Sequence, residues 1–164
     1  MNPRLVINTD NSLLDGVTDR DLPVLREIFD DPQTRKYLPE LYELVDSDSG
    51  LQQFVSSFAA YAQRNDGYLW GIRHDGQLTG FVATMEFSSD PAVFYAMHPD
   101  YRSRGLMKDA LCSVIDYLNK HEMIRTIATD VYKENEVSIN ILMQLGFTVN
   151  YEDEQKFYMI KVLE

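Results

Sequence analysis

A short apolar segment that turns abruptly into an amphipathic helix constrains this fold more than any other feature. The apolar run Val93–Met97 ends at His98-Pro99, and a basic turn leads from there into a segment with helical periodicity. A strand that turns sharply into a helix leaves the first amide N–H groups of the helix without partners inside it. Those donors and the positive end of the helix dipole suit an anion. The pattern therefore predicts a strand–turn–helix unit with an anion-binding turn.

Three cations lie close to this turn, at Arg102, Arg104 and Lys108, although Lys and Arg supply only 15 of the 164 residues. Gly105 has no side chain to keep a phosphate away from the backbone. The chain carries a net charge of −11, which repels polyphosphate surfaces and argues against general nucleic-acid binding. These three positive charges are grouped in a chain that is otherwise strongly negative, so we interpret the turn as a pyrophosphate site. The alternative is structural, because any strand–turn–helix needs a glycine and some surface charge.

The rest of the chain predicts a mixed α/β fold. Apolar runs bounded by turn residues predict strands at 5–7, 13–14, 68–73, 77–87, 91–97, 125–131, 147–149 and 156–162. Apolar spacing of three and four predicts helices at 18–30, 32–37, from 49 onward, 105–121 and 135–145. This order predicts one sheet with one strand–helix–strand crossover, in a single domain over residues 1–164.

Composition excludes several classes of protein. No apolar run approaches the roughly 20 residues that span a bilayer, and the start of the chain is too weakly apolar for a secretory signal. The single cysteine cannot form an internal disulfide, so we expect a cytoplasmic location. His74, His98 and His121 share no metal-ligand spacing, and we expect no metal.

The turn itself matches a known pattern. It reads Arg102-Ser103-Arg104-Gly105-Leu106-Met107. This resembles the acetyl-CoA-binding motif of the GNAT N-acetyltransferases, which is Arg/Gln-x-x-Gly-x-Gly/Ala. Met107 departs from the motif, where a small residue is usual. The Met107 side chain is expected to point away from the cosubstrate, while its backbone N–H still donates to the pyrophosphate.

A second match lies further along the chain. There the sequence reads Asn135-Glu136-Val137-Ser138 and then Leu145-Gly146-Phe147. This spacing resembles the last helix of the same family and its exit. The resemblance covers about residues 4–164 and is closest to the branch that acetylates the N-termini of ribosomal proteins.

The resemblance implies a GNAT-type fold, a mixed and mostly antiparallel sheet with splayed central strands and flanking helices. It implies acetyl-CoA as cosubstrate, with the pantetheine arm beside residues 96–98 and the N–H of Met97 or His98 facing the thioester oxygen. The cofactor-binding residues implied are Met97, His98, Arg102, Ser103, Arg104, Gly105, Leu106, Met107, Lys108, Asn135 and Ser138.

Transfer of an acetyl group to an amine also needs a proton for the departing thiolate. In the branch that this chain resembles, a serine at the Ser138 position is proposed to donate it, although a solvated helix serine is the alternative. Many GNAT enzymes use a tyrosine where this chain has Leu142, so Ser138 or water must act instead. Asn135 would contact pantetheine, cap a helix, or do both. Glu86, on the central strand 77–87, is the candidate general base, and a surface-facing glutamate is the alternative.

An acidic loop between the early helices suggests which kind of acceptor the protein binds. It contains Glu40, Glu43, Asp46 and Asp48. In the family these helices form one wall of the acceptor groove, and a negative wall favours a cationic amine such as a small amine or a peptide or protein N-terminus. A solvated acidic loop is the alternative.

These observations predict an N-acetyltransferase that moves acetyl from acetyl-CoA to a primary amine by direct attack, with Ser138 and Glu86 as catalytic residues. The alternative from another class is a GNAT-fold sensor or interaction module that binds acyl-CoA without turnover. A toxin that modifies aminoacyl-tRNA would need a basic groove, which the acidity disfavours. A homodimer is compatible with the exposed sheet edges of this family.

Overall fold

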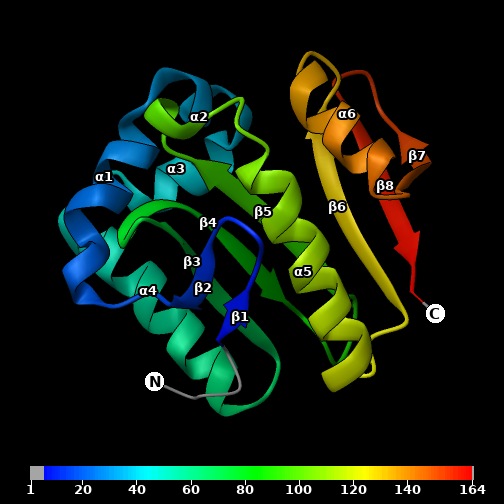
Figure 1. Ribbon diagram of the computed structural model, residues 1–164. Helices are drawn as coiled ribbons and strands as arrows, with labels where there is room; N and C mark the ends of the chain where they lie inside the picture. The colour runs from blue at the N-terminus through cyan, green and yellow to red at the C-terminus, as the bar shows by residue number, and fades with distance from the viewer. Residues whose placement is uncertain (1–5, 164) are drawn as a thin grey trace.

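Across residues 6–163, which the computed structural model describes, eight strands form one sheet in the order β1-β2-β3-β4-β5-β6-β8-β7 (Figure 1). Neighbouring strands are antiparallel except β5 and β6, which run parallel. The bounds are β1 Ile7–Asn8, β2 Leu13–Gly16, β3 Gly67–His74, β4 Gln77–Met85, β5 Ala92–Met97, β6 Thr126–Tyr132, β7 Thr148–Glu152 and β8 Lys156–Val162. The predicted mixed, mostly antiparallel sheet is confirmed.

Helices cover both faces of this sheet (Figure 1). One group comprises α1 Leu22–Asp30, α2 Pro32–Tyr37, α3 Pro39–Val45 and α4 Asp48–Gln63; the other comprises α5 Leu106–His121 and α6 Glu136–Gln144. Because side chains alternate along a strand, the central strands feed two cores. Leu69 and Phe81 pack in the core that includes α1 and α4, whereas Trp70 and Val82 pack in the core that includes α5.

The sheet opens at its centre, between the two strands that run parallel. Within residues 6–163, β5 and β6 pair at a single position, Ala92 with Ala128. Beyond that point the two strands diverge. The later part of β5 therefore turns backbone groups toward a space that β6 does not fill, and this opening positions the site described below.

Three predicted boundaries are corrected. The polar stretch expected to be a loop forms α3, because Pro39 begins a helical turn and Val45 packs into the core beside α4. The predicted strand 77–87 ends at Met85, and Glu86 lies beyond it with a left-handed φ of 61°. Ser47 rather than Ser49 caps α4, since its hydroxyl accepts the N–H of Gly50 at 3.0 Å. Leu5, the start of the predicted first strand, lies outside the described residues.

No helix within residues 6–163 is both long and apolar enough to cross a bilayer.

A half-buried ion pair joins the first helical segment to the sheet. The Arg73 guanidinium donates to Asp21 at 2.6 Å and to Asp15 at 2.7 Å, and Asp21 also accepts the N–H of Thr18 at 2.9 Å. Burial opposes ionisation of Asp21, but the hydrogen bonds from Arg73 and Thr18 outweigh it and hold the pKa of this carboxyl below its ordinary value.

Asp21→Asn is expected to lower the free energy of unfolding by about 2–4 kcal/mol, because it leaves the Arg73 charge without its main partner. Since the folded pKa of Asp21 is lowered, this stabilisation is present above about pH 4 and is lost as the pH falls through the folded pKa. Chemical denaturation at pH 7 and at pH 3 measures both effects. Asp19→Asn, an exposed change in the same turn, should stay within about 0.5 kcal/mol of the parent protein, and an equal loss in both variants would contradict the role of the ion pair.

Candidate active site

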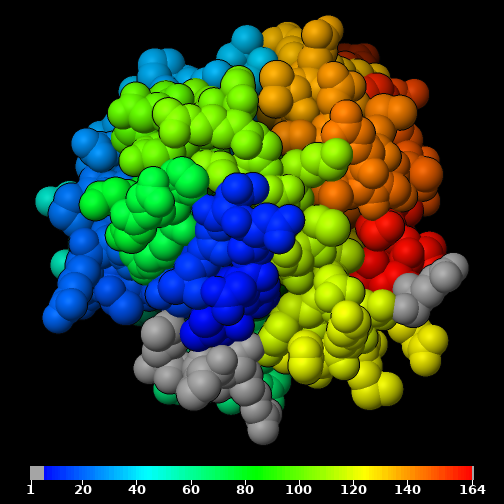
Figure 2. All heavy atoms as spheres, viewed as in Figure 1, coloured from blue at the N-terminus to red at the C-terminus, as the bar shows by residue number. Residues whose placement is uncertain are grey.

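Two cavities meet at the opening between β5 and β6. The first has a volume of about 550 Å³ and lies among β5, the start of α5, β6 and α6. The second, of about 690 Å³, lies among α3, α4, the end of β4 and the middle of β5, and β6 and β8 each add one residue to its lining. Both are lined by Leu38, Phe94 and Asp130. Figure 2 shows that segments far apart in sequence, the turn before α5 and α6, meet on one face of the molecule.

The turn between β5 and α5 has the predicted strand–turn–helix form. Ser103 and Gly105 adopt left-handed φ values of 65° and 76°, and Gly105 is the N-cap of α5. A Cβ at Gly105 would meet no heavy atom within 4 Å, so the glycine is favoured by its backbone conformation rather than by close packing. Leu106, Met107 and Lys108, in the first turn of α5, line the first cavity. Their N–H groups are among the orphan donors of the helix.

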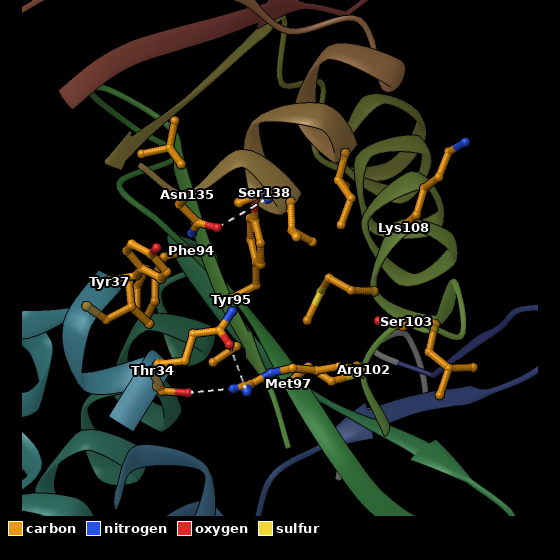
Figure 3. A pocket seen from close by; sticks show the side chains of 18 of the residues that line it. Thr34, Tyr37, Phe94, Tyr95, Met97, Arg102, Ser103, Lys108, Asn135 and Ser138 are labelled. Atoms are coloured by element: carbon orange, nitrogen blue, oxygen red, sulfur yellow. Dashed lines mark hydrogen bonds between the residues drawn. The ribbon is translucent and has the colours of Figure 1, made fainter. Parts of the chain in front are cut away.

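The three cations of this turn have different surroundings. Arg102 reaches across to the start of α2, where it donates to Asp31 at 2.6 Å. It also donates to Thr34 at 3.2 Å, as Figure 3 shows. Arg104 is exposed, donates to the Asp100 carbonyl at 3.1 Å and stacks on Tyr101. Lys108 is exposed at the edge of the cavity. Arg104 and Lys108 are thus placed to meet an anion, whereas Arg102 ties the turn to α2.

Asp31 is the partner that holds Arg102. Its carboxylate also caps α2 by accepting the N–H of Thr34 at 3.1 Å. Burial opposes its ionisation, but the hydrogen bonds from Arg102 and Thr34 outweigh burial and lower the pKa of Asp31. The turn and α2 are therefore joined through a charged carboxylate.

The register of β4 and β5 distinguishes the two predicted backbone donors. The N–H of His98 donates to the Thr79 carbonyl at 2.7 Å, so it faces β4. Hydrogen-bonded pairs alternate along an antiparallel ladder, and Met97, opposite Gly80, therefore turns its N–H toward the diverging β6. His98 lines neither cavity, and its ring instead accepts the N–H of Asp100 at 3.1 Å. The geometry favours Met97 as the free donor.

Asn135 and Ser138, at the start of α6, both line the first cavity. The Asn135 side-chain oxygen accepts the N–H of Ser138 at 3.3 Å, which is a helix N-cap (Figure 3). The predicted cap is confirmed. The same bond holds the backbone of Ser138 in the first turn of α6, where the residue lines the first cavity.

A tyrosine that the sequence analysis did not single out lies against Ser138. The hydroxyl of Tyr95, on β5, forms a short hydrogen bond with the Ser138 hydroxyl. Burial raises the pKa of Tyr95 to about 12, and the bond to Ser138 only partly offsets this, so the phenol stays protonated at neutral pH. Leu142, at the position where the family resemblance implies a tyrosine in many enzymes, is buried in the core and lines neither cavity. Strand alternation from Met97 could have placed Tyr95 on this face, but nothing local in the sequence pairs it with Ser138.

Glu86 does not line either cavity, although its partner Tyr61 lines the second one. Its carboxylate accepts the Tyr61 hydroxyl at 3.1 Å and the Ser89 hydroxyl at 3.2 Å. Beyond the end of β4, the left-handed backbone at Glu86 directs the chain into a turn. The structure does not bring this candidate base to the residues of the first cavity.

A charged group, which we call the junction cluster, lies where the cavities meet. It consists of Glu40 on α3, Asp130 on β6 and Lys156 on β8. Lys156 binds Asp130 at 2.9 Å and Glu40 at 3.3 Å. Burial disfavours the charged ammonium, but the bond to Asp130 and both carboxylate charges raise the pKa of Lys156 above its ordinary value. Of the four residues in the predicted acidic loop, Glu40 is the one that lines a cavity.

Within residues 6–163, no three His, Cys, Asp or Glu side chains are grouped so that they could hold a metal ion.

Comparison with known proteins agrees with this geometry. Residues 12–148 match the Acetyltransferase (GNAT) domain family. The chain is 26% identical over 150 residues to an uncharacterized N-acetyltransferase, YoaA, of Bacillus subtilis (strain 168), covering 87% of this chain and 82% of the relative.

Two solved structures have the same fold. The first is RimL, a ribosomal L7/L12 alpha-N-protein acetyltransferase in complex with coenzyme A, with a TM-score of 0.84, 13% identity and coverage of 96% of this chain and 98% of that one. The second is spermidine N-acetyltransferase from Vibrio cholerae in complex with CoA and spermine, with a TM-score of 0.77, 14% identity and coverage of 93% and 95%.

Proposed function

The chain belongs to the GNAT acetyltransferase family, and from that premise we propose that it transfers an acetyl group from acetyl-CoA to a primary amine. One observation carries the proposal. The first cavity brings together the turn before α5, the open edge of β5 and the Tyr95–Ser138 hydroxyl pair. An anion site, a backbone donor and a proton donor are the parts that thioester aminolysis needs.

The turn would hold the diphosphate of the cosubstrate. Its left-handed φ at Gly105 directs the N–H groups of the first turn of α5 outward, and the open space beside Gly105 leaves room for a phosphate. Arg104 and Lys108 add positive charge. Arg102 acts indirectly, because its guanidinium is bound to Asp31 and fixes the turn against α2.

The other end of the cavity would carry out the chemistry. Acetyl-CoA supplies the acetyl group as a thioester, which a neutral amine can attack directly. The N–H of Met97 would donate to the carbonyl oxygen as it gains negative charge. As the carbon–nitrogen bond forms and the carbon–sulfur bond breaks, Ser138 would protonate the sulfur, with Tyr95 orienting its hydroxyl. Solvent takes the proton that the amine loses and restores the one that Ser138 gives up.

The acceptor would approach from the second cavity. Phe94 and Asp130 line both cavities, so an amine beside them lies at the boundary with the first cavity. This route keeps the two substrates on opposite sides of the opening between β5 and β6. Direct attack of the amine on the thioester needs no covalent enzyme intermediate. A cytoplasmic location and a homodimer remain predictions from the sequence.

Calorimetry with acetyl-CoA, followed by a thiol-release assay with a panel of amines, tests the proposal. We expect saturable binding of acetyl-CoA and release of one thiol for each amide formed. Binding without thiol release for any amine would support the sensor or interaction module instead. Absence of binding would remove the enzymatic assignment.

A further inference from the structure

We propose that the acceptor is a small primary amine that carries one positive charge on an apolar body, and that this body binds in the second cavity. The inference rests on the proposed function, since it names the substrate class of the same site. It depends on three observations, which are the apolar lining of the cavity, the charge of the junction cluster and the wall shared with the first cavity.

Aromatic and aliphatic side chains form most of the second cavity. Phe58 lies 5.3 Å from Phe54 and 6.1 Å from Phe94, measured between ring centroids, and all three line the cavity. Leu44 completes the rim with 69% of its surface exposed. A volume of about 690 Å³ is in the range of sites for small molecules. Such a lining stabilises an apolar body and contributes little to a polar chain.

Charge in this cavity is confined to the junction cluster. Among the described residues that line the second cavity, the charged ones are Glu40, Asp130 and Lys156. Two carboxylates and one ammonium leave a net charge of −1, which complements one added cation. Outside the junction cluster, a second ammonium on the acceptor would meet apolar side chains and the neutral polar groups of Gln53, Ser57 and Tyr61, but no opposite charge in the lining, and burial of an unpaired charge is costly. The Glu86 carboxylate lies behind Tyr61, a lining residue, and is not itself in the lining; both of its oxygens already accept hydrogen bonds, one from Tyr61 and one from Ser89.

The shared wall sets where the amine lies. Asp130 belongs both to the junction cluster and to the lining of the first cavity, and Phe94 also lines both. An ammonium that binds Asp130 therefore stands at the opening, next to the strand that carries Tyr95, and it attacks the thioester as the neutral amine after it has lost one proton to solvent. Its apolar body extends away from the first cavity, between α3 and α4. The body and the charge thus occupy the two chemically different ends of one site.

A panel of four acceptors tests this assignment with the intact protein and saturating acetyl-CoA. It contains 2-phenylethylamine, ethylamine, 1,4-diaminobutane and a short peptide with a free N-terminal serine. Thiol release gives kcat/KM for each. We expect 2-phenylethylamine to exceed ethylamine by about 10- to 100-fold, because the ring is buried, and to exceed the diamine and the peptide as well.

Leu44→Asp tests the charge argument without altering the core. It adds a third carboxylate to the cavity, at its exposed rim and outside the junction cluster, so it should shift the ratio of kcat/KM for 1,4-diaminobutane over 2-phenylethylamine by about 10-fold toward the diamine. Met143→Asp is the matched control, because Met143 is an exposed helical residue, at 62%, that lines neither cavity. It should leave the ratio unchanged.

The outcomes separate the two proposals. Turnover of the diamine or the peptide in preference to 2-phenylethylamine would overturn the substrate class and leave the acetyltransferase assignment intact. An unchanged ratio in Leu44→Asp would remove the second cavity from acceptor selection. Thiol release with none of the four acceptors, despite binding of acetyl-CoA, would overturn both proposals.

Discussion

Replacing Gly105 with glutamate is expected to lower the affinity for acetyl-CoA by about 100-fold or more, as measured by calorimetry. Gly105 is the N-cap of α5, its φ is 76°, and no protein atom lies within 4 Å of the position that a Cβ would take. A glutamate there would place a carboxylate where a phosphate is proposed to approach. Like charges in contact cost about 4 kcal/mol near a protein surface, and the side chain would also cover the N–H groups of the helix.

Gly76→Glu provides the matched control. Gly76 lies in the turn between β3 and β4 with a φ of 77°, and a Cβ there also meets nothing within 4 Å. The same change should therefore cost similar backbone strain, about 1–2 kcal/mol, but leave the affinity for acetyl-CoA within about threefold of the parent. Equal affinities in the two variants would show that the turn before α5 does not hold the diphosphate.

Ser138→Ala is expected to lower kcat by about 100-fold, the usual contribution of a general acid. The KM for acetyl-CoA should change little, because the hydroxyl would act on the leaving sulfur rather than anchor the cosubstrate. Tyr95→Phe, which keeps the ring and removes the hydroxyl bonded to Ser138, should lower kcat by about 10-fold through loss of orientation. Steady-state thiol release measures both values.

Two further variants separate chemistry from structure. Ser138→Thr retains a hydroxyl and should recover most of the activity lost in Ser138→Ala. The double variant of Tyr95 and Ser138 should be no slower than Ser138→Ala alone, because the two hydroxyls act as one unit. If Ser138→Ala had an unchanged kcat, water would be the proton donor, and if Ser138→Thr were as slow as Ser138→Ala, the serine would have only a structural role.

Local patterns were enough to predict most of the fold. The apolar runs at 77–87 and 91–97 and the periodicity of 105–121 each predicted an element close to the observed one. These features depend on residues that are near each other in the chain. The α-helix α3, which was expected to be a loop, is short and rich in acidic residues, and it is stabilised by packing of Val45 and its neighbours rather than by propensity.

The site was predictable only in part. The turn before α5 and the cap at Asn135 are local, and the sequence indicated both. The bond between Tyr95 and Ser138 joins residues 43 positions apart, and the bond between Lys156 and Glu40 joins residues 116 positions apart. No local sequence pattern predicts contacts between residues so far apart in the chain, since these contacts depend on how β5 and β6 diverge. For the same reason, the partners of Arg102 on α2 could not be read from its basic turn.

The bond between Arg102 and Asp31 has a thermodynamic consequence. It couples the proposed diphosphate turn to α2, and α2 leads directly through Leu38 into α3, whose residues border the acceptor cavity. Because this bond joins the two sites, we expect binding of the acyl donor to raise the affinity for the amine. Linkage then requires the amine to raise the affinity for the donor by the same factor. The apparent dissociation constant of each ligand therefore depends on the concentration of the other.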